Sequence, residues 1–164
     1  ACYDEGKRCA ESLFFDYNRQ HATKIKVARI FNTYGPRMQP DDGRVVTNMV
    51  HQALDGQPLT ICGDGSQTRS FCYVSDEVDG IVRLLQSDVR DPVNIGNPHE
   101  FTIRELADVI ADVIDVELSI SYLPLPSDDP KVRRPDIGRA TKLLGWEPQA
   151  QLADGIRLMV ESLR

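Results

Sequence analysis

The 164-residue sequence lacks several features that define other classes of protein. No apolar run approaches the ~20 residues that a membrane-spanning helix requires. Positive charge is not in excess: 19 lysines and arginines stand against 25 aspartates and glutamates, and the net charge of −6 argues against a nucleic-acid-binding protein. There is no initiator Met and no basic segment followed by an apolar stretch, so the sequence gives no indication of secretion.

Disulfide and metal-binding patterns are also lacking. The four cysteines show no C-x-x-C spacing, so we expect reduced thiols in a cytoplasmic protein. The three histidines are scattered at helix ends and in loops, so we expect them at the surface and expect no metal site. The residues concerned are Cys2, Cys9, Cys62, Cys72, His21, His51 and His99.

Helical and strand-like segments alternate along the sequence, which indicates an α/β fold. Local signals mark several helix boundaries: Ser75 is expected to cap one helix, Thr102 with Glu105 forms a capping box, and Gly145 closes a short helix. We expect helices over 4–21, 45–56, 76–86, the segment after Thr102, 137–145 and 151–164, and extended segments over 25–31, within 58–75, over 92–96 and over 117–123.

The turn that binds phosphate in dinucleotide folds is missing. No strand is followed by a glycine-rich turn of the G-x-G-x-x-G type. In contrast, NTYGPRMQPDDGR, residues 32–44, is a long loop that follows a strand directly, and loops of that length are more often functional than not.

Tyr3 and Lys7 lie four positions apart in the opening stretch CYDEGKRCAE. This spacing puts both side chains on one helix face, about 6 Å apart along the axis. A lysine ammonium beside a phenol favours the phenolate, and such a tyrosine can exchange a proton with a sugar hydroxyl. Taken alone, the two residues are equally consistent with an exposed pair that has no role.

Four segments in a fixed order change that balance. They are YDEGKRCAE, ARIFNTYGPRMQPDDGRVV, GDGSQTRSFCYVSD and DDPKVRRPDI…LLGWEP, and with them nearly the whole chain resembles the extended short-chain dehydrogenase/reductase family. The resemblance implies the C-terminal part of a Rossmann-type fold, with its last parallel strands and a small α/β substrate-binding domain. Residues 1–35 would be a remnant of the NAD-binding domain, and 36–164 mainly the nucleotide-sugar domain, with a strand and helix near 70–97 returning to the Rossmann part.

Within that family, the loop GPRM…DDGRVV is most similar to that of the branch that converts UDP-glucuronate to UDP-xylose. The resemblance implies oxidation of the sugar at C4 by bound NAD⁺, loss of CO₂ from the resulting β-keto acid, and reduction of the ketone by the same cofactor. The family's N-terminal half, which carries the glycine-rich NAD loop, is not in this chain. We therefore expect the chain alone to be inactive. The resemblance also implies that the whole enzyme is a homodimer.

The resemblance also implies roles for individual residues. Tyr3 would be the acid and base at the C4 hydroxyl, and Lys7 would hold the nicotinamide ribose. Thr33 and Arg44 are further candidates for contact with the cofactor. The expected substrate-binding residues are Tyr17, Asn32, Arg44, Arg69 and Arg133.

Arginine suits this task because its guanidinium fork binds phosphate or carboxylate through two hydrogen bonds. By the resemblance, Arg69 would bind the nucleotide ribose or diphosphate, Arg133 the diphosphate, and Arg44 the junction of cofactor and substrate. Asn32 follows strand 25–31 at the end where α/β sheets bind ligands. Tyr17 is equally well explained as a core residue.

Two alternatives remain open from the sequence. One is a neighbouring nucleotide-sugar epimerase or 4,6-dehydratase of the same family. The other is a non-enzymatic module that binds a nucleotide sugar through its arginines. A cytoplasmic location is expected, and a membrane anchor before residue 1 would be compatible with the same sequence.

Overall fold

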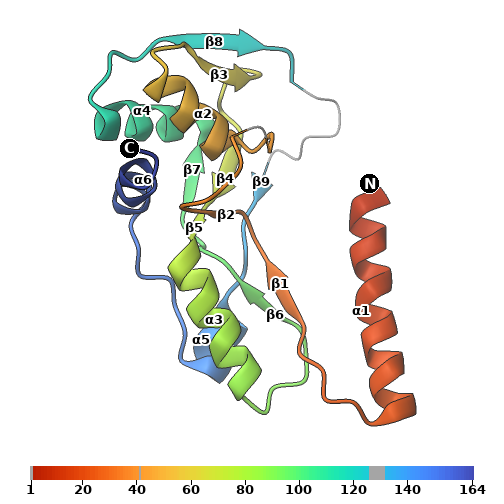
Figure 1. Cartoon of the computed structure of the whole chain (residues 1–164). Coiled ribbons are helices and arrows are strands. Elements are labelled where there is room, and N and C mark those ends of the chain that lie inside the picture. The colour runs from red at the N-terminus through yellow and green to blue at the C-terminus, as the bar shows by residue number, and fades with distance from the viewer. Residues whose placement is uncertain (1, 41, 126–131) are drawn as a thin grey trace.

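The computed structural model describes residues 2–40, 42–125 and 132–164. Figure 1 shows an upper and a lower body, with the first helix standing beside them. The helices are α1 (Cys2–His21), α2 (Val45–Leu54), α3 (Val74–Gln86), α4 (Ile103–Ile114), α5 (Gly138–Leu144) and α6 (Leu152–Glu161). The predicted α/β fold class is confirmed.

The strands are short, and most pair in parallel. β1 (Ala28–Ile30) pairs with β6 (Val93–Ile95), β2 (Thr33–Tyr34) with β5 (Cys72–Tyr73), and β3 (Leu59–Cys62) with β8 (Ile120–Leu123), all in parallel. In the remaining sheet, β4 (Thr68–Ser70) lies between β7 (Glu100–Thr102), which is antiparallel to it, and β9 (Val132–Arg133), which is parallel.

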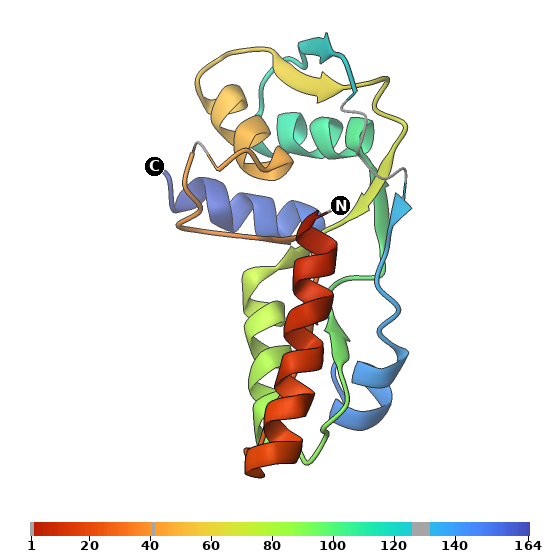
Figure 2. The ribbon, with the colours of Figure 1, turned by 90° about the vertical axis from the view of Figure 1, so that its right-hand side faces the viewer.

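The upper body encloses the larger of two hydrophobic cores, called here the upper core. Apolar side chains at helical spacing on α2, α4 and α6 meet the inward side chains of β3, and Figure 2 shows α6 lying beneath α2 and α4. The fully enclosed residues of the upper core include Met49, Val50, Ile61, Leu106, Ala107, Ile110 and Ile156.

The lower body has its own hydrophobic core, the lower core, built around Trp146. Trp146 is almost fully buried, as expected for a core residue, and its indole N–H donates to the Asp76 carbonyl at 3.0 Å. A Cβ on Gly80 of α3 would lie 2.7 Å from Ile95 and 2.9 Å from Trp146, so only glycine permits this close approach of the helix. The other buried members are Cys72, Leu84, Val93, Ile95 and Ala140.

The two cores do not divide the chain into consecutive blocks. Segment 137–146 returns to the lower core after the chain has passed through the upper one, alongside the expected return near 70–97. The predicted division into residues 1–35 and 36–164 stays a prediction.

Several predicted boundaries are confirmed and one is wrong. Thr102 and Glu105 form the capping box in full, and Gly145 ends α5 in the left-handed conformation. Ser75, in contrast, lies inside α3: the helix starts at Val74 with Tyr73 as its N-cap, and no side chain caps it. The reason is that β5 runs directly into α3, so strand pairing rather than a capping side chain sets the start of the helix.

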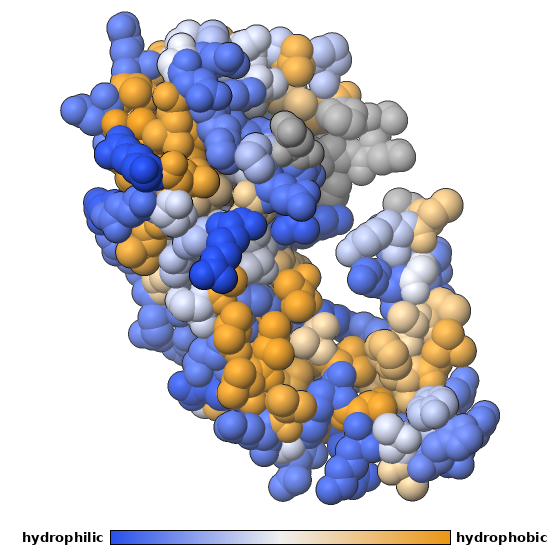
Figure 3. All heavy atoms as spheres, viewed as in Figure 1, coloured by the Kyte–Doolittle hydropathy of each residue, from blue (hydrophilic) through white to orange (hydrophobic). Residues whose placement is uncertain are grey.

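α1 contains no buried residue along its 20 positions. Leu13, Phe14 and Tyr17 are all at least half exposed, and Figure 3 shows apolar surface along this helix. A bidentate ion pair joins α1 to β1, with Arg29 donating to both carboxylate oxygens of Glu11 at 2.7 Å. None of the helices in the described part of the chain is both long enough and apolar enough to span a bilayer.

Candidate functional site

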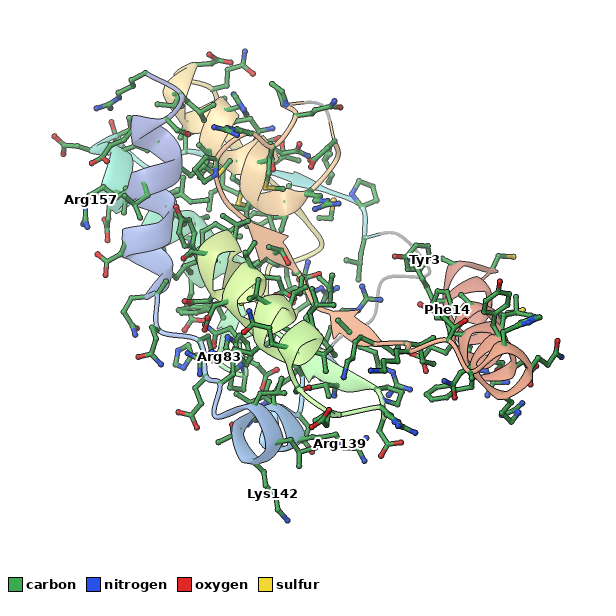
Figure 4. The ribbon with its side chains drawn as sticks, turned by 60° about the horizontal axis from the view of Figure 1, so that its bottom comes forward. Tyr3, Phe14, Arg83, Arg139, Lys142 and Arg157 are labelled. Carbon is green, nitrogen blue, oxygen red and sulfur yellow. The ribbon has the colours of Figure 1, made fainter. Side chains whose placement is uncertain are left out.

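Tyr3 and Lys7 lie together at the N-terminal end of α1. The Lys7 ammonium is 5.4 Å from the centroid of the Tyr3 ring, so the predicted pairing on one helix face is present. Both side chains are exposed, and Figure 4 shows Tyr3 on a helix that stands apart from the rest of the molecule. The pair is therefore free to contact a ligand.

Tyr17 is not brought to this pair. Fourteen residues along α1 correspond to about 21 Å of helix axis, which places Tyr17 far from Tyr3. Its ring packs on His21 at 4.4 Å between centroids, and the side chain is 56% exposed, so the alternative of a core position is wrong.

Asn32 and Thr33 lie where β1 ends, at the edge of the sheet where parallel strands bind ligands. The Asn32 amide donates to the Ser70 carbonyl at 3.2 Å, and the Asn32 carbonyl accepts from the Cys72 amide at 2.8 Å. The Thr33 hydroxyl donates to the Phe31 carbonyl at 2.9 Å. These bonds fix the segment against β4 and β5.

Arg69 and Arg133 are directly opposite each other on β4 and β9. Because registered residues of a parallel pair project from the same face, the two guanidinium groups share one side of this sheet. Arg69 is 8% exposed and donates to the Thr68 carbonyl at 2.7 Å, while Arg133 is exposed. The structure therefore brings two arginines that are 64 positions apart in sequence to registered positions on one side of this sheet.

Arg44 is at the N-cap of α2, outside that arginine pair. Its side chain is 66% exposed and lies 3.5 Å from the Asp42 carboxylate, and its amide donates to the same carboxylate at 2.9 Å. A cation is unfavourable at a helix N-terminus, and Asp42 offsets it.

Glu77 is a buried acidic residue that the sequence reading did not single out. It is 3% exposed, and burial raises the pKa of its carboxyl to about 7, opposed by the Cys72 thiol and the Thr33 hydroxyl. The sequence contained a signal for this burial. Glu77, Gly80 and Leu84 fall at i, i+3 and i+7, the spacing of one helix face, and they are the buried residues of α3. Acidic residues in a first turn are common, so the sequence favoured a solvent-facing role.

The histidines were expected at the surface, and one departs from that. His21 and His99 are exposed, but His51 on α2 is half-buried, and its Nε2 has no hydrogen-bond partner among the residues that the structure describes. Among the described residues, no group of three or more His, Cys, Asp or Glu could hold a metal ion.

The fold places the chain among Rossmann-type α/β proteins, and solved structures of 4-epimerases superpose on it. A UDP-glucose 4-epimerase from Thermotoga maritima, solved with UDP-glucose, superposes with a TM-score of 0.91 at 28% identity over 96% of this chain and 51% of that one. A UDP-glucuronic acid 4-epimerase from Bacillus cereus, solved with UDP-glucuronic acid and NAD, gives 0.86 at 29% identity over 93% of this chain and 49% of that one.

The chain belongs to the NAD dependent epimerase/dehydratase family, whose model matches residues 1–96. UDP-glucuronic acid decarboxylase 5 of Arabidopsis thaliana is 56% identical over all 164 residues, and the match covers 48% of that protein. UDP-glucuronic acid decarboxylase 1 of Danio rerio is 51% identical over 161 residues, with 98% of this chain and 38% of that protein covered. The chain thus spans about half of the length, or less, of these curated relatives.

Proposed function

We propose that the whole protein containing this chain decarboxylates UDP-glucuronate to UDP-xylose, with NAD as its recycled cofactor. The observation that supports this most strongly is the 56% and 51% identity with decarboxylases, against 28–29% with the 4-epimerases of known structure. Substrate preference within a family depends on a few contacts between side chains and substrate. The higher identity with the decarboxylases favours the view that this protein makes the contacts that they make.

The residues present fit one end of NAD. The exposed ammonium of Lys7 and the phenol of Tyr3 lie on one helix face and can donate hydrogen bonds to a ribose. The glycine-rich phosphate cradle is not part of this sequence. When bound, NAD supplies hydride acceptance and return at the sugar C4.

Tyr3 is proposed to take the proton from the C4 hydroxyl and later return it. Lys7, one helical turn away, would hold the nicotinamide ribose through its ammonium donors. A ketone at C4 is β to the C6 carboxylate, so the electrons of the C5–C6 bond pass to the ketone oxygen as CO₂ leaves.

Arg69 and Arg133 are proposed to bind the diphosphate. Two cationic forks on one sheet face match two adjacent phosphates, and the burial of Arg69 lowers the local dielectric and strengthens the attraction. Asn32, Thr33 and Arg44 remain candidates for contact near the sugar and cofactor. Tyr17 also remains a candidate for contact with the substrate, about 21 Å along the helix axis from Tyr3.

The test is CO₂ release by the full-length protein from UDP-glucuronate labelled at C6, with UDP-xylose identified as the product. We expect stoichiometric CO₂ with no net NADH, and Tyr3→Phe should lower kcat by about 10²-fold or more. Conversion to UDP-galacturonate without CO₂ would instead support the epimerase alternative. Tight binding of UDP without turnover of any nucleotide sugar would support the non-enzymatic binding module.

Three further points belong to the proposal. The 164-residue chain alone is inactive, which absorbance of NADH with UDP-glucuronate and NAD⁺ would test. The full-length protein is a homodimer, a state favoured by the exposed apolar side chains of α1 and measurable by light scattering. The division into an NAD-binding remnant and a nucleotide-sugar domain, and the cytoplasmic location, stay predictions.

A further inference from the structure

Glu77 is a buried acid, and no basic side chain in the described part of the chain pairs with it. It is in the first turn of α3, 3% exposed, and among the described residues neither carboxylate oxygen has a hydrogen-bond partner. Burying a polar group without a hydrogen-bond partner destabilises the folded state. The unpaired carboxyl of Glu77 therefore needs a structural explanation.

The two polar side chains that interact with Glu77 already give their hydrogens to backbone carbonyls. Thr33 of β2 and Cys72 of β5 are a registered pair, and both interact with Glu77. The Thr33 hydroxyl gives its hydrogen to the Phe31 carbonyl at 2.9 Å, and the Cys72 thiol gives its hydrogen to the Tyr73 carbonyl at 3.8 Å. Each can turn that hydrogen to an ionised Glu77 only by giving up its backbone partner. A protonated Glu77, in contrast, can donate to either one.

The surroundings of α3 also disfavour a charge on Glu77. The acid nearest in sequence is Asp76, whose carboxylate accepts the amides of Gln149 and Ala150, and the phenols of Tyr34 and Tyr73 lie on the paired strands. Lys142 of α5 is exposed and points away from the molecule (Figure 4). The nearby arginines have other partners: Arg29 of β1 with Glu11, Arg83 of α3 with Asp79, and Arg139 of α5 with Asp91.

Burial without a cation accordingly raises the pKa of the Glu77 carboxyl to about 7, against the opposing effect of the Cys72 thiol and the Thr33 hydroxyl. The position of the residue in the first turn of a helix also favours the anion, so the low polarity of the site outweighs this contribution.

We propose that Glu77 is a positioning residue: its neutral carboxyl allows β2 to stay packed against β5, and its ionisation loosens the Asn32–Thr33 segment and weakens ligand binding there. Asn32 is linked to the same place, because its carbonyl accepts the Cys72 amide. The part that concerns ligand binding rests on the proposed function; the part that concerns the strand pair does not.

The first readout is local and needs no ligand. In the full-length protein, the protection factor of the Cys72 amide is measured by hydrogen exchange with NMR detection between about pH 5 and pH 8.5, corrected for the intrinsic rate. We expect wild-type protection to fall as pH rises towards neutrality, by at most about tenfold per pH unit, and to level off above about pH 7, because opening releases the proton that the buried carboxyl holds. Glu77→Gln, which stays neutral and keeps a donor, should show no such fall, and the exposed Glu161→Gln should behave as wild type.

Glu77→Leu provides a second variant in case Gln does not fold. It carries neither charge nor donor, so its Cys72 protection should be independent of pH. Wild-type protection that does not change with pH, or a Gln or Leu variant that retains the wild-type fall, would overturn the proposal.

The second readout is the affinity of the full-length protein for NAD over the same pH range. Affinity that falls with pH in wild type but not in Glu77→Gln supports the link to the binding segment, and an identical fall in both overturns that link. Protection that depends on Glu77 in a protein that binds no NAD would leave the strand-pair role standing and sink the proposed function. If the full-length protein releases CO₂ but Glu77→Gln leaves the pH dependence of Cys72 protection unchanged, the proposed function stands and the proposed role of Glu77 is wrong.

Discussion

Arg69 and Arg133 are the residues on which nucleotide binding is expected to depend most. We predict that Arg69→Ala and Arg133→Ala each weaken UDP binding by the full-length protein by about tenfold or more, since a charge-assisted hydrogen bond contributes about 1.5–3 kcal/mol. Calorimetry measures this directly. Arg157→Ala is the matched control, because Arg157 is a surface residue that pairs with Asp154 on its own helix. Equal losses in all three variants would contradict the assignment.

The sequence could suggest these two arginines by resemblance but not their pairing. The registration of β4 with β9 depends on contacts between segments far apart in the chain, and β9 is too short to carry a strand pattern. The spacing of Tyr3 and Lys7 was predictable because helix geometry is local. The unpaired state of Glu77 was not, because burial depends on the strands packed against α3.

Glu77 also predicts a pH dependence of stability. Its folded pKa of about 7 is above the ordinary 4.5, so the folded state binds the extra proton between these values and unfolding becomes easier as pH rises through this window. The free energy of unfolding should fall by up to about 3 kcal/mol over that range and then level off. Urea titrations should show that the free energy of unfolding of Glu77→Gln, relative to that of wild type, increases from acid to neutral pH. A constant difference between the two proteins would refute this.

Among the elements, α6 depends on a close contact with β2. A Cβ on Gly155 would lie 2.1 Å from the Tyr34 hydroxyl oxygen and 2.8 Å from the Tyr73 ring, and Tyr34 is itself fixed by its bond to the Leu152 carbonyl at 3.2 Å. Gly155→Ala should therefore destabilise the protein by about 1–3 kcal/mol, the usual cost of overpacking. Gly6→Ala on α1 is the control, since nothing lies within 4 Å of its Cβ position. Chemical denaturation of both variants distinguishes them, and a stable Gly155→Ala protein would argue against this packing.

Element boundaries set by local chemistry were predictable, and those set by pairing were not. The capping box at Thr102 and the left-handed Gly145 need only neighbouring residues. Strand 25–31 shortens to Ala28–Ile30, and β7 was not anticipated, because such short strands exist only where a partner is present.

On the scale of the whole molecule, α1 is the least supported part. A helix without buried side chains gains little from tertiary packing, and isolated helices are marginal in water. In the 164-residue chain we predict rapid hydrogen exchange along α1 and slow exchange at Ile110 and Ala111 of α4, which also report that the sample is folded. Comparable protection of α1 and α4 would contradict this view.

The alternation of the chain between the upper and lower cores has an evolutionary consequence. Residues 34–71, 103–120 and 152–160 contribute to the upper core, and 72–95 and 137–146 to the lower one. No single crossover between two genes could exchange one core and leave the other intact. A recombination event at a single point that keeps both cores intact would therefore have to exchange the two bodies together.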